Sequence, residues 1–186
     1  WSRGDTWLMS DINLGATSKA DGDVNAYGMY YQWGRKDPFP APVDLKTSYN
    51  GQISDVYPSG TVIFKTAQDG VTLEAAIQNP ATYYWGNANK NAQDWSDVSN
   101  DGYWSTSSKT DFDPCPYGYV VPDKSQIEAL IGAYSGTTAA YGYMLNCDGG
   151  ISNYLCSGGW IRRKLNPDSE CAHTGQHPHY WSTTTA

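Results

Sequence analysis

Long apolar stretches and charged residues are both scarce in this sequence. No window of about 18 or more apolar residues occurs in the chain of 186 residues, so no segment is predicted to span a membrane. Charged residues make up only 17% of the chain, and the net charge is −7. The densest basic group is the short run Arg162, Arg163 and Lys164. Nucleic-acid binding depends on many phosphate contacts from basic side chains, so we expect no nucleic-acid partner.

Motifs for catalysis and for metal binding are missing as well. The four cysteines include no Cys-x-x-Cys pair, and His173, His177 and His179 lack the spacing of metal ligands on a regular element. The chain contains no Gly-x-Ser-x-Gly elbow, and no nucleophile is paired with a base in a known pattern. We therefore expect a protein that is not an enzyme and holds no catalytic or structural metal.

Tyrosine, tryptophan, glycine and proline are what the chain has in abundance. It contains 15 Tyr and 8 Trp but only 3 Phe. Tyr and Trp suit half-exposed sites, because each has an apolar ring that carries a polar group. The 19 Gly and 10 Pro favour many turns. Two long loops are predicted, over Arg35–Tyr57 and Asn87–Asp111. Loops of this length in a compact domain usually carry function, so the second, with its embedded tryptophans, is of particular interest.

Capping signals predict two helices. Thr72 can cap a short helix that Asn79-Pro80 ends, with Leu73, Ala76 and Ile77 on its buried face. A longer helix is predicted after Pro122, where Asp123 and Gln126 have the spacing of a capping box. The spacing places Ile127, Leu130, Ile131 and Tyr134 on its buried face. Gly136 lies where the helix is expected to end.

Short apolar or aromatic runs predict the strands. They lie at residues 6–13, 26–33, 61–65, 141–145, 159–163 and 180–184. Few short elements with long Gly-rich connections indicate an α+β fold with small antiparallel sheets and one or two helices. We expect residues 1–186 to form a single domain. Because the chain starts abruptly at Trp1 and stops abruptly after Ala186, we expect it to be the C-terminal part of a longer protein.

Two of the cysteines bracket a short glycine-rich segment. Cys147 and Cys156 enclose the residues DGGISNYL, which resemble a small closed loop. A Cys147–Cys156 disulfide is the interpretation we favour, and free buried thiols are the alternative. Export from the cell would favour the disulfide.

Four sequence motifs along the chain resemble those of a known family. In chain order these are Trp7 with Asn13-Leu14, the predicted strand with Tyr27, Gly28, Tyr31 and Trp33, the elbow DPCPYGYVVP from Asp113 to Pro122, and the late run Tyr180–Thr183. They resemble the major paralogous domain (FISUMP) of bacterial surface lipoproteins and fimbrial proteins. The resemblance implies a C-type-lectin-like fold and an extracellular place on the bacterial surface. The inserted segment from Ala75 to the elbow is similar to that of fimbrial tip proteins.

The resemblance implies a pilus or surface adhesin domain that binds a glycan or a host or microbial protein. The chain departs from the family pattern at two points. Val120 stands where relatives have an arginine, and the final strand after Thr183 is missing. Cys115 would then have its partner beyond the end of this chain. The alternative function follows from the second departure: a structural pilus or lipoprotein assembly subunit completed by a strand from a partner.

Two kinds of residue are candidates for ligand contact. Exposed aromatic rings stack on sugars, and the tryptophans and tyrosines in or beside the polar loops are Trp95, Tyr103, Trp104 and Trp160. The alternative is that they fill a thin core. Asn166-Pro167-Asp168 and Glu170 resemble the loop with which C-type lectins hold calcium and a sugar, although the sequence is also typical of a plain turn. We expect no cofactor, with calcium at this loop as the alternative.

Overall fold

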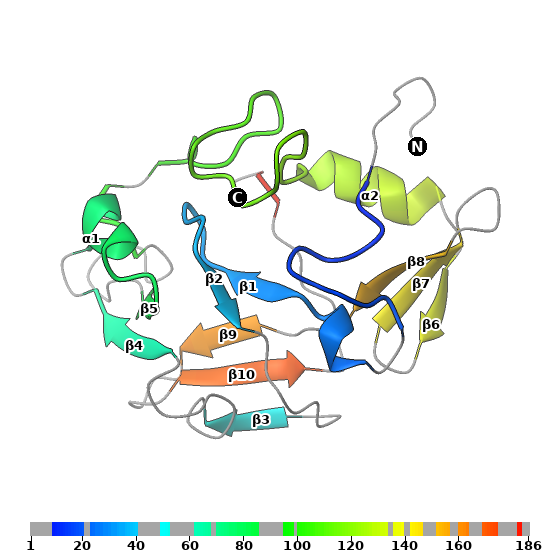
Figure 1. Cartoon of the computed structure of the whole chain (residues 1–186), viewed down its shortest axis with the longest axis horizontal. Helices are drawn as coiled ribbons and strands as arrows, with labels where there is room; N and C mark the ends of the chain where they lie inside the picture. The colour runs from blue at the N-terminus through cyan, green and yellow to red at the C-terminus, as the bar shows by residue number, and fades with distance from the viewer. Residues whose placement is uncertain are drawn as a thin grey trace.

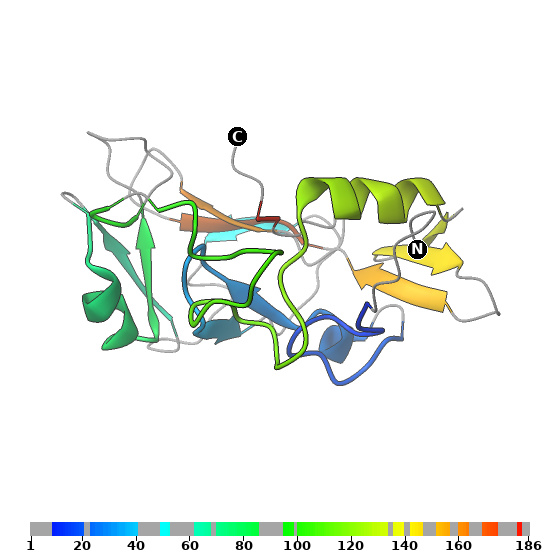
Figure 2. The same ribbon diagram turned by 90° about the horizontal axis from the view of Figure 1, so that it is seen from above.

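The computed structural model describes residues 9–20, 23–40, 49–52, 62–67, 70–85, 95–98, 100–133, 136–139, 142–146, 152–156, 160–163, 169–174 and 182–183. A two-stranded hairpin, β1 with β2, occupies the middle of the molecule (Figures 1 and 2). The helix α1 with strands β4 and β5 lies on one side of the hairpin. The longer helix α2 lies on the other side, next to the sheet of β6, β7 and β8.

The central hairpin follows a short 3-10 helix at Val24–Ala26 and joins β1 (Met29–Tyr31) to β2 (Pro38–Pro40). The strands are antiparallel, with Tyr30 opposite Phe39. The aromatic strand predicted at residues 26–33 is therefore present over three of its residues. The prediction of a continuous loop from Arg35 onward is wrong, because two prolines can sit in an edge strand whose N–H groups are not needed for pairing.

A β-strand, a helix and a second strand form a unit with parallel strands. It consists of β4 (Ile63–Thr66), α1 (Leu73–Ile77) and β5 (Thr82–Trp85), with β4 and β5 paired in parallel. As predicted, Thr72 caps α1, and its hydroxyl accepts a hydrogen bond from the Ala75 N–H at 3.1 Å. Ala76 is buried, but Ile77 is exposed, so the predicted buried face is one residue too wide. The sequence patterns do not predict β5 or its parallel pairing with β4. Parallel strands are usually joined by a longer helix than α1, so the sequence gives little indication of this pairing.

Helix α2 (Lys124–Ala133) begins at the predicted capping box. The Asp123 carboxylate accepts from the Gln126 N–H at 2.8 Å, and the Gln126 side chain accepts from the Asp123 N–H at 3.0 Å. Leu130 is buried as expected. Tyr134 lies outside the described residues, and Gly136 is the first residue of the next strand rather than part of the helix end.

Two antiparallel sheets of three strands complete the described structure. One is a meander of β6 (Gly136–Ala139), β7 (Gly142–Asn146) and β8 (Ser152–Cys156). In the other, β10 (Ser169–Thr174) lies between β3 (Tyr49–Gln52) and β9 (Trp160–Arg163). The strands predicted at 141–145 and 159–163 are thus found. No helix in the described part of the chain is both long and apolar enough to cross a membrane.

The two terminal strands predicted from the sequence are not seen where the structure describes the chain. Residues 9–13 are not in a strand, with a bend at Asp11 and Ile12, and residues 1–8 lie outside the described residues. Ser182 and Thr183 are not in a strand, while Tyr180 and Trp181 lie outside the described residues. The Thr183 N–H nevertheless donates to the Pro122 carbonyl at 2.9 Å, so Thr183 lies against the residues that precede α2.

Strand β8 ends at Cys156, which lies opposite Gly142 of β7. Cys147 lies outside the described residues, so the Cys147–Cys156 disulfide stays a prediction.

Candidate functional site

A buried turn, Gln32–Arg35, connects the central hairpin to its surroundings. The Arg35 N–H donates to the Gln32 carbonyl at 3.0 Å, and Gly34 has a φ of 76°. A side chain at Gly34 would meet the ring of Tyr103 and would also be strained by this backbone conformation. We call residues 32–35 the hub turn, because its residues contact β5, the end of α1 and the aromatic residues at 95 and 103–104.

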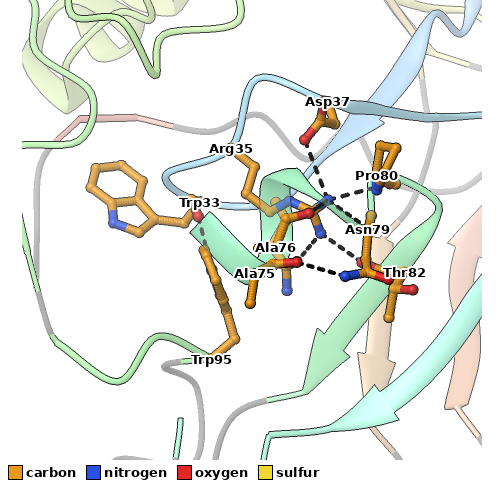
Figure 3. A network of polar contacts seen from close by, with 10 residues as sticks. Trp33, Arg35, Asp37, Ala75, Ala76, Asn79, Pro80, Thr82 and Trp95 are labelled. Carbon is orange, nitrogen blue, oxygen red and sulfur yellow. Dashed lines mark hydrogen bonds and ion pairs between the residues drawn. The ribbon is translucent and has the colours of Figure 1, made fainter. Parts of the chain in front are cut away.

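The Arg35 guanidinium is completely buried and holds the end of α1 in place (Figure 3). It donates to the carbonyls of Thr82 at 2.6 Å and Ala76 at 3.1 Å, and it forms an ion pair with Asp37 at 3.4 Å. Weaker bonds reach the carbonyls of Asn79 and Pro80. Burial lowers the pKa of Arg35 from its ordinary value, and the Asp37 carboxylate acts in the opposite direction. A guanidinium stays protonated nonetheless, so this charge is permanent.

The aromatic residues of the Asn87–Asp111 segment pack on the hub turn. The Trp95 indole N–H donates to the Trp33 carbonyl at 2.9 Å, and the Trp104 ring lies 4.9 Å from that of Trp33. Trp95, Tyr103 and Trp104 are only 3%, 8% and 1% exposed. These three rings therefore fill the core, which is the alternative given for them in the sequence analysis.

The elbow from Asp113 to Pro122 is organised by one buried carboxylate. The side chain of Asp113 accepts from the backbone N–H groups of Cys115 at 2.8 Å and Val121 at 3.1 Å. The Lys109 ammonium lies 3.0 Å from the same carboxylate and donates to the Tyr119 carbonyl at 2.9 Å. Both ends of the elbow are thus tied to Asp113, and its charge is balanced by Lys109.

The tip of the elbow is a second tight turn, Pro116–Tyr119, which we call the elbow turn. The Tyr119 N–H donates to the Pro116 carbonyl at 3.1 Å, and Gly118 has a φ of 86°. Tyr117 is 98% exposed, more than any other large apolar or aromatic side chain in the described residues; the next is Val98 at 62%. Tyr119 is also exposed, whereas Val121 is buried.

Cys115 is a free cysteine that packs beside the aromatic core. Burial raises the pKa of its thiol to about 12, and the nearby Asp113 carboxylate acts in the same direction. Burial likewise raises the pKa of Tyr31 to about 12. A thiol held in its protonated form is a poor nucleophile and a poor metal ligand.

The other predicted site residues lie on β9, on β10 or between these two strands in the sequence. Asn166 and Asp168 lie outside the described residues. Trp160 begins β9, and Glu170 lies in β10 opposite Arg162, with their side chains outside the description. Within the described residues, no group of three or more His, Cys, Asp or Glu side chains could hold a metal ion.

Comparisons with known proteins do not extend this description. A scan against protein-family models and searches of curated proteins and of solved structures found no match to this chain. The inference of function therefore depends on the two turns and on the resemblance of the sequence motifs.

Sequence reasoning missed Arg35, Asp113 and Tyr117 as individual residues. Arg35 falls at the start of the predicted loop Arg35–Tyr57, and no local pattern in the sequence indicates that its side chain is buried. Asp113 was treated as part of a motif without a role. Tyr117 was overlooked, because its exposure depends on the direction in which the elbow turn projects.

Proposed function

We propose that this chain is a surface-exposed binding domain of a bacterial adhesin, which contacts a glycan or a protein ligand through the elbow turn. The proposal includes an α+β, C-type-lectin-like fold and an extracellular place on a fimbrium or an outer-membrane lipoprotein. The motif resemblance supports the class of protein. The single observation that supports the binding surface is the exposure of Tyr117 on a turn that is rigidly held.

A rigid, exposed tyrosine is well suited to recognition. Tyr117 has few rotatable bonds, so placing its ring against a ligand costs little conformational entropy. The bonds of Asp113 and Lys109 to the two sides of the elbow turn fix its backbone before any ligand arrives. Pre-organisation of this kind raises affinity by lowering the cost of binding. The space beside Gly118 is open, since an added Cβ would meet no atom within 4 Å.

The test is binding of the purified chain to an array of glycans and of host and microbial surface proteins. We expect at least one ligand whose affinity falls about tenfold or more in Tyr117→Ala, because truncation of a central aromatic contact has effects of this size. Tyr117→Phe keeps the ring and is expected to retain binding. Repeating the array with EDTA shows whether calcium takes part.

The matched control is Ile77→Ala, which shortens another exposed apolar side chain on α1. It is expected to bind like the wild type. Absence of binding to every glycan and protein would contradict the proposal, and so would a ligand whose affinity is the same for wild type and Tyr117→Ala.

A further inference from the structure

The outer edge of the parallel β4–β5 pair is filled by side chains instead of a third strand. On the inner edge, the Ile63 N–H donates to the Ala81 carbonyl at 2.9 Å. Alternate carbonyls of a strand point to opposite edges, so those of Thr82 and Tyr84 face away from β4. The Thr82 carbonyl accepts from Arg35 at 2.6 Å, and the Tyr84 carbonyl accepts from Gln32 at 2.6 Å.

The two side chains form one buried unit. Arg35 also donates to the Gln32 side-chain oxygen at 3.2 Å, so each residue holds the other in position. Gln32 and Arg35 are both buried, and the Phe39 ring lies 5.2 Å from the guanidinium carbon. The Thr82 N–H on the same edge donates to the Asn79 carbonyl at 3.0 Å. The Thr82 N–H and the carbonyls of Thr82 and Tyr84 on this edge are therefore already engaged.

We propose that Gln32 and Arg35 close the β5 edge against strand addition, and that the edge pairs with β5 of a second copy of this chain when they are removed. An unprotected strand edge is a template for pairing with another chain. The sequence of β5, Thr-Tyr-Tyr-Trp, is uncharged and has high β-propensity. Two identical edges can pair about a twofold axis, which makes a second copy the fitting occupant.

The experiment compares Gln32→Leu and Arg35→Met with the wild type by sedimentation equilibrium over a range of protein concentrations. We expect the association constant to rise about tenfold or more in each variant relative to the wild type. Gln32→Leu is the milder change, because Arg35 still bonds to Thr82. It keeps the test decisive if Arg35→Met does not fold.

Two controls separate edge opening from general effects. Gln78→Leu makes the same substitution at an exposed position after α1 and is expected to leave association unchanged. Val121→Ala weakens the core beside the elbow without touching the β5 edge, and it is expected to lower stability without promoting dimers.

Hydrogen exchange then locates any new contact. Slower exchange of the peptide spanning Thr82–Trp85 in the associated variants supports strand addition at this edge. The proposal is overturned if Gln32→Leu associates no more than the wild type, if Val121→Ala associates to the same extent, or if the protected peptides lie elsewhere in the chain.

Discussion

The hub turn and the elbow turn have the same backbone design and opposite surroundings. Each closes with a hydrogen bond from its fourth N–H to its first carbonyl, at 3.0 Å in Gln32–Arg35 and 3.1 Å in Pro116–Tyr119. Each has a glycine with positive φ in third place, 76° in one and 86° in the other. The aromatic residue in second place packs inside the protein in the first turn and projects into solvent in the second.

The difference shows that a turn motif does not determine what the turn does. The hub turn is buried because its neighbours supply partners: carbonyls for the guanidinium of Arg35 and rings for Trp33. The elbow turn is held from below by Asp113 and leaves Tyr117 without a surface to pack on. Changes at the hub turn should therefore affect folding, and changes to the Tyr117 side chain should affect binding with little effect on stability.

The largest effect is expected from Arg35→Met. It removes a buried cation and leaves several carbonyls and the Asp37 carboxylate without their donor. We expect the free energy of unfolding to fall by about 3 to 5 kcal/mol in a chemical denaturation experiment. Lys36→Met, at the exposed neighbouring position, is the control and should change stability by less than about 0.5 kcal/mol. Equal stability of the two variants would contradict the claim that the buried bonds of Arg35 stabilise the fold.

A smaller loss is expected from Asp113→Asn, which extends the comparison to the support beneath the elbow turn. An amide can accept only at one atom, so its N–H₂ group would face a backbone N–H or the Lys109 ammonium. We expect a loss of about 2 to 3 kcal/mol in denaturant unfolding. Asp111→Asn, at an exposed position nearby, should be close to neutral, and a neutral Asp113→Asn would contradict the role given to this carboxylate.

Asp123→Ala should cost about 1 kcal/mol, since it removes the N-cap of α2. Hydrogen bonds from the Ser125 hydroxyl and from the Gln126 N–H lower the pKa of Asp123 from its ordinary value of 3.8. A lowered pKa stabilises the fold above that value, and the stabilisation is lost as pH falls through the lower, folded-state pKa. Thermal unfolding at neutral and acidic pH should therefore show the gap between wild type and variant narrowing in acid. A gap that widens in acid would refute this.

The smallest effect on stability is expected from Tyr117→Ala. The exposed ring makes little contact with the rest of the protein, so the free energy of unfolding should change by less than about 0.5 kcal/mol. Denaturant unfolding checks this directly. A loss above about 1 kcal/mol would mean that the ring packs on the protein, which would weaken the case for Tyr117 as a ligand contact.

Local chemistry made part of the fold predictable. The two helix starts were correctly placed because Thr72, Asp123 and Gln126 are capping residues whose bonds span three positions. Strand β5 and its parallel pairing were missed, because they depend on a contact with β4 across the short helix α1. Strand β2 was missed because its prolines are signals for a loop unless the strand lies at an edge.

The candidate site was less predictable than the fold. Trp95 and Trp104 lie in a polar segment, and only the packing on the hub turn reveals that their rings are buried. The exposure of Tyr117 depends on the direction of the elbow turn, which Asp113 sets through bonds to residues two and eight positions away. Composition and spacing identify the aromatic residues but not the side of the backbone on which each one lies.

A matched pair of glycine substitutions tests the contrast between the two turns most directly. Both Gly34→Ala and Gly118→Ala place a Cβ at a positive φ, which costs about 1 to 2 kcal/mol. Only Gly34→Ala also drives that Cβ into the Tyr103 ring, and overpacking adds about 1 to 3 kcal/mol. Denaturant unfolding should find Gly34→Ala less stable than Gly118→Ala by about 2 kcal/mol. Equal losses in the two variants would contradict the assignment of one turn to the core and the other to the surface.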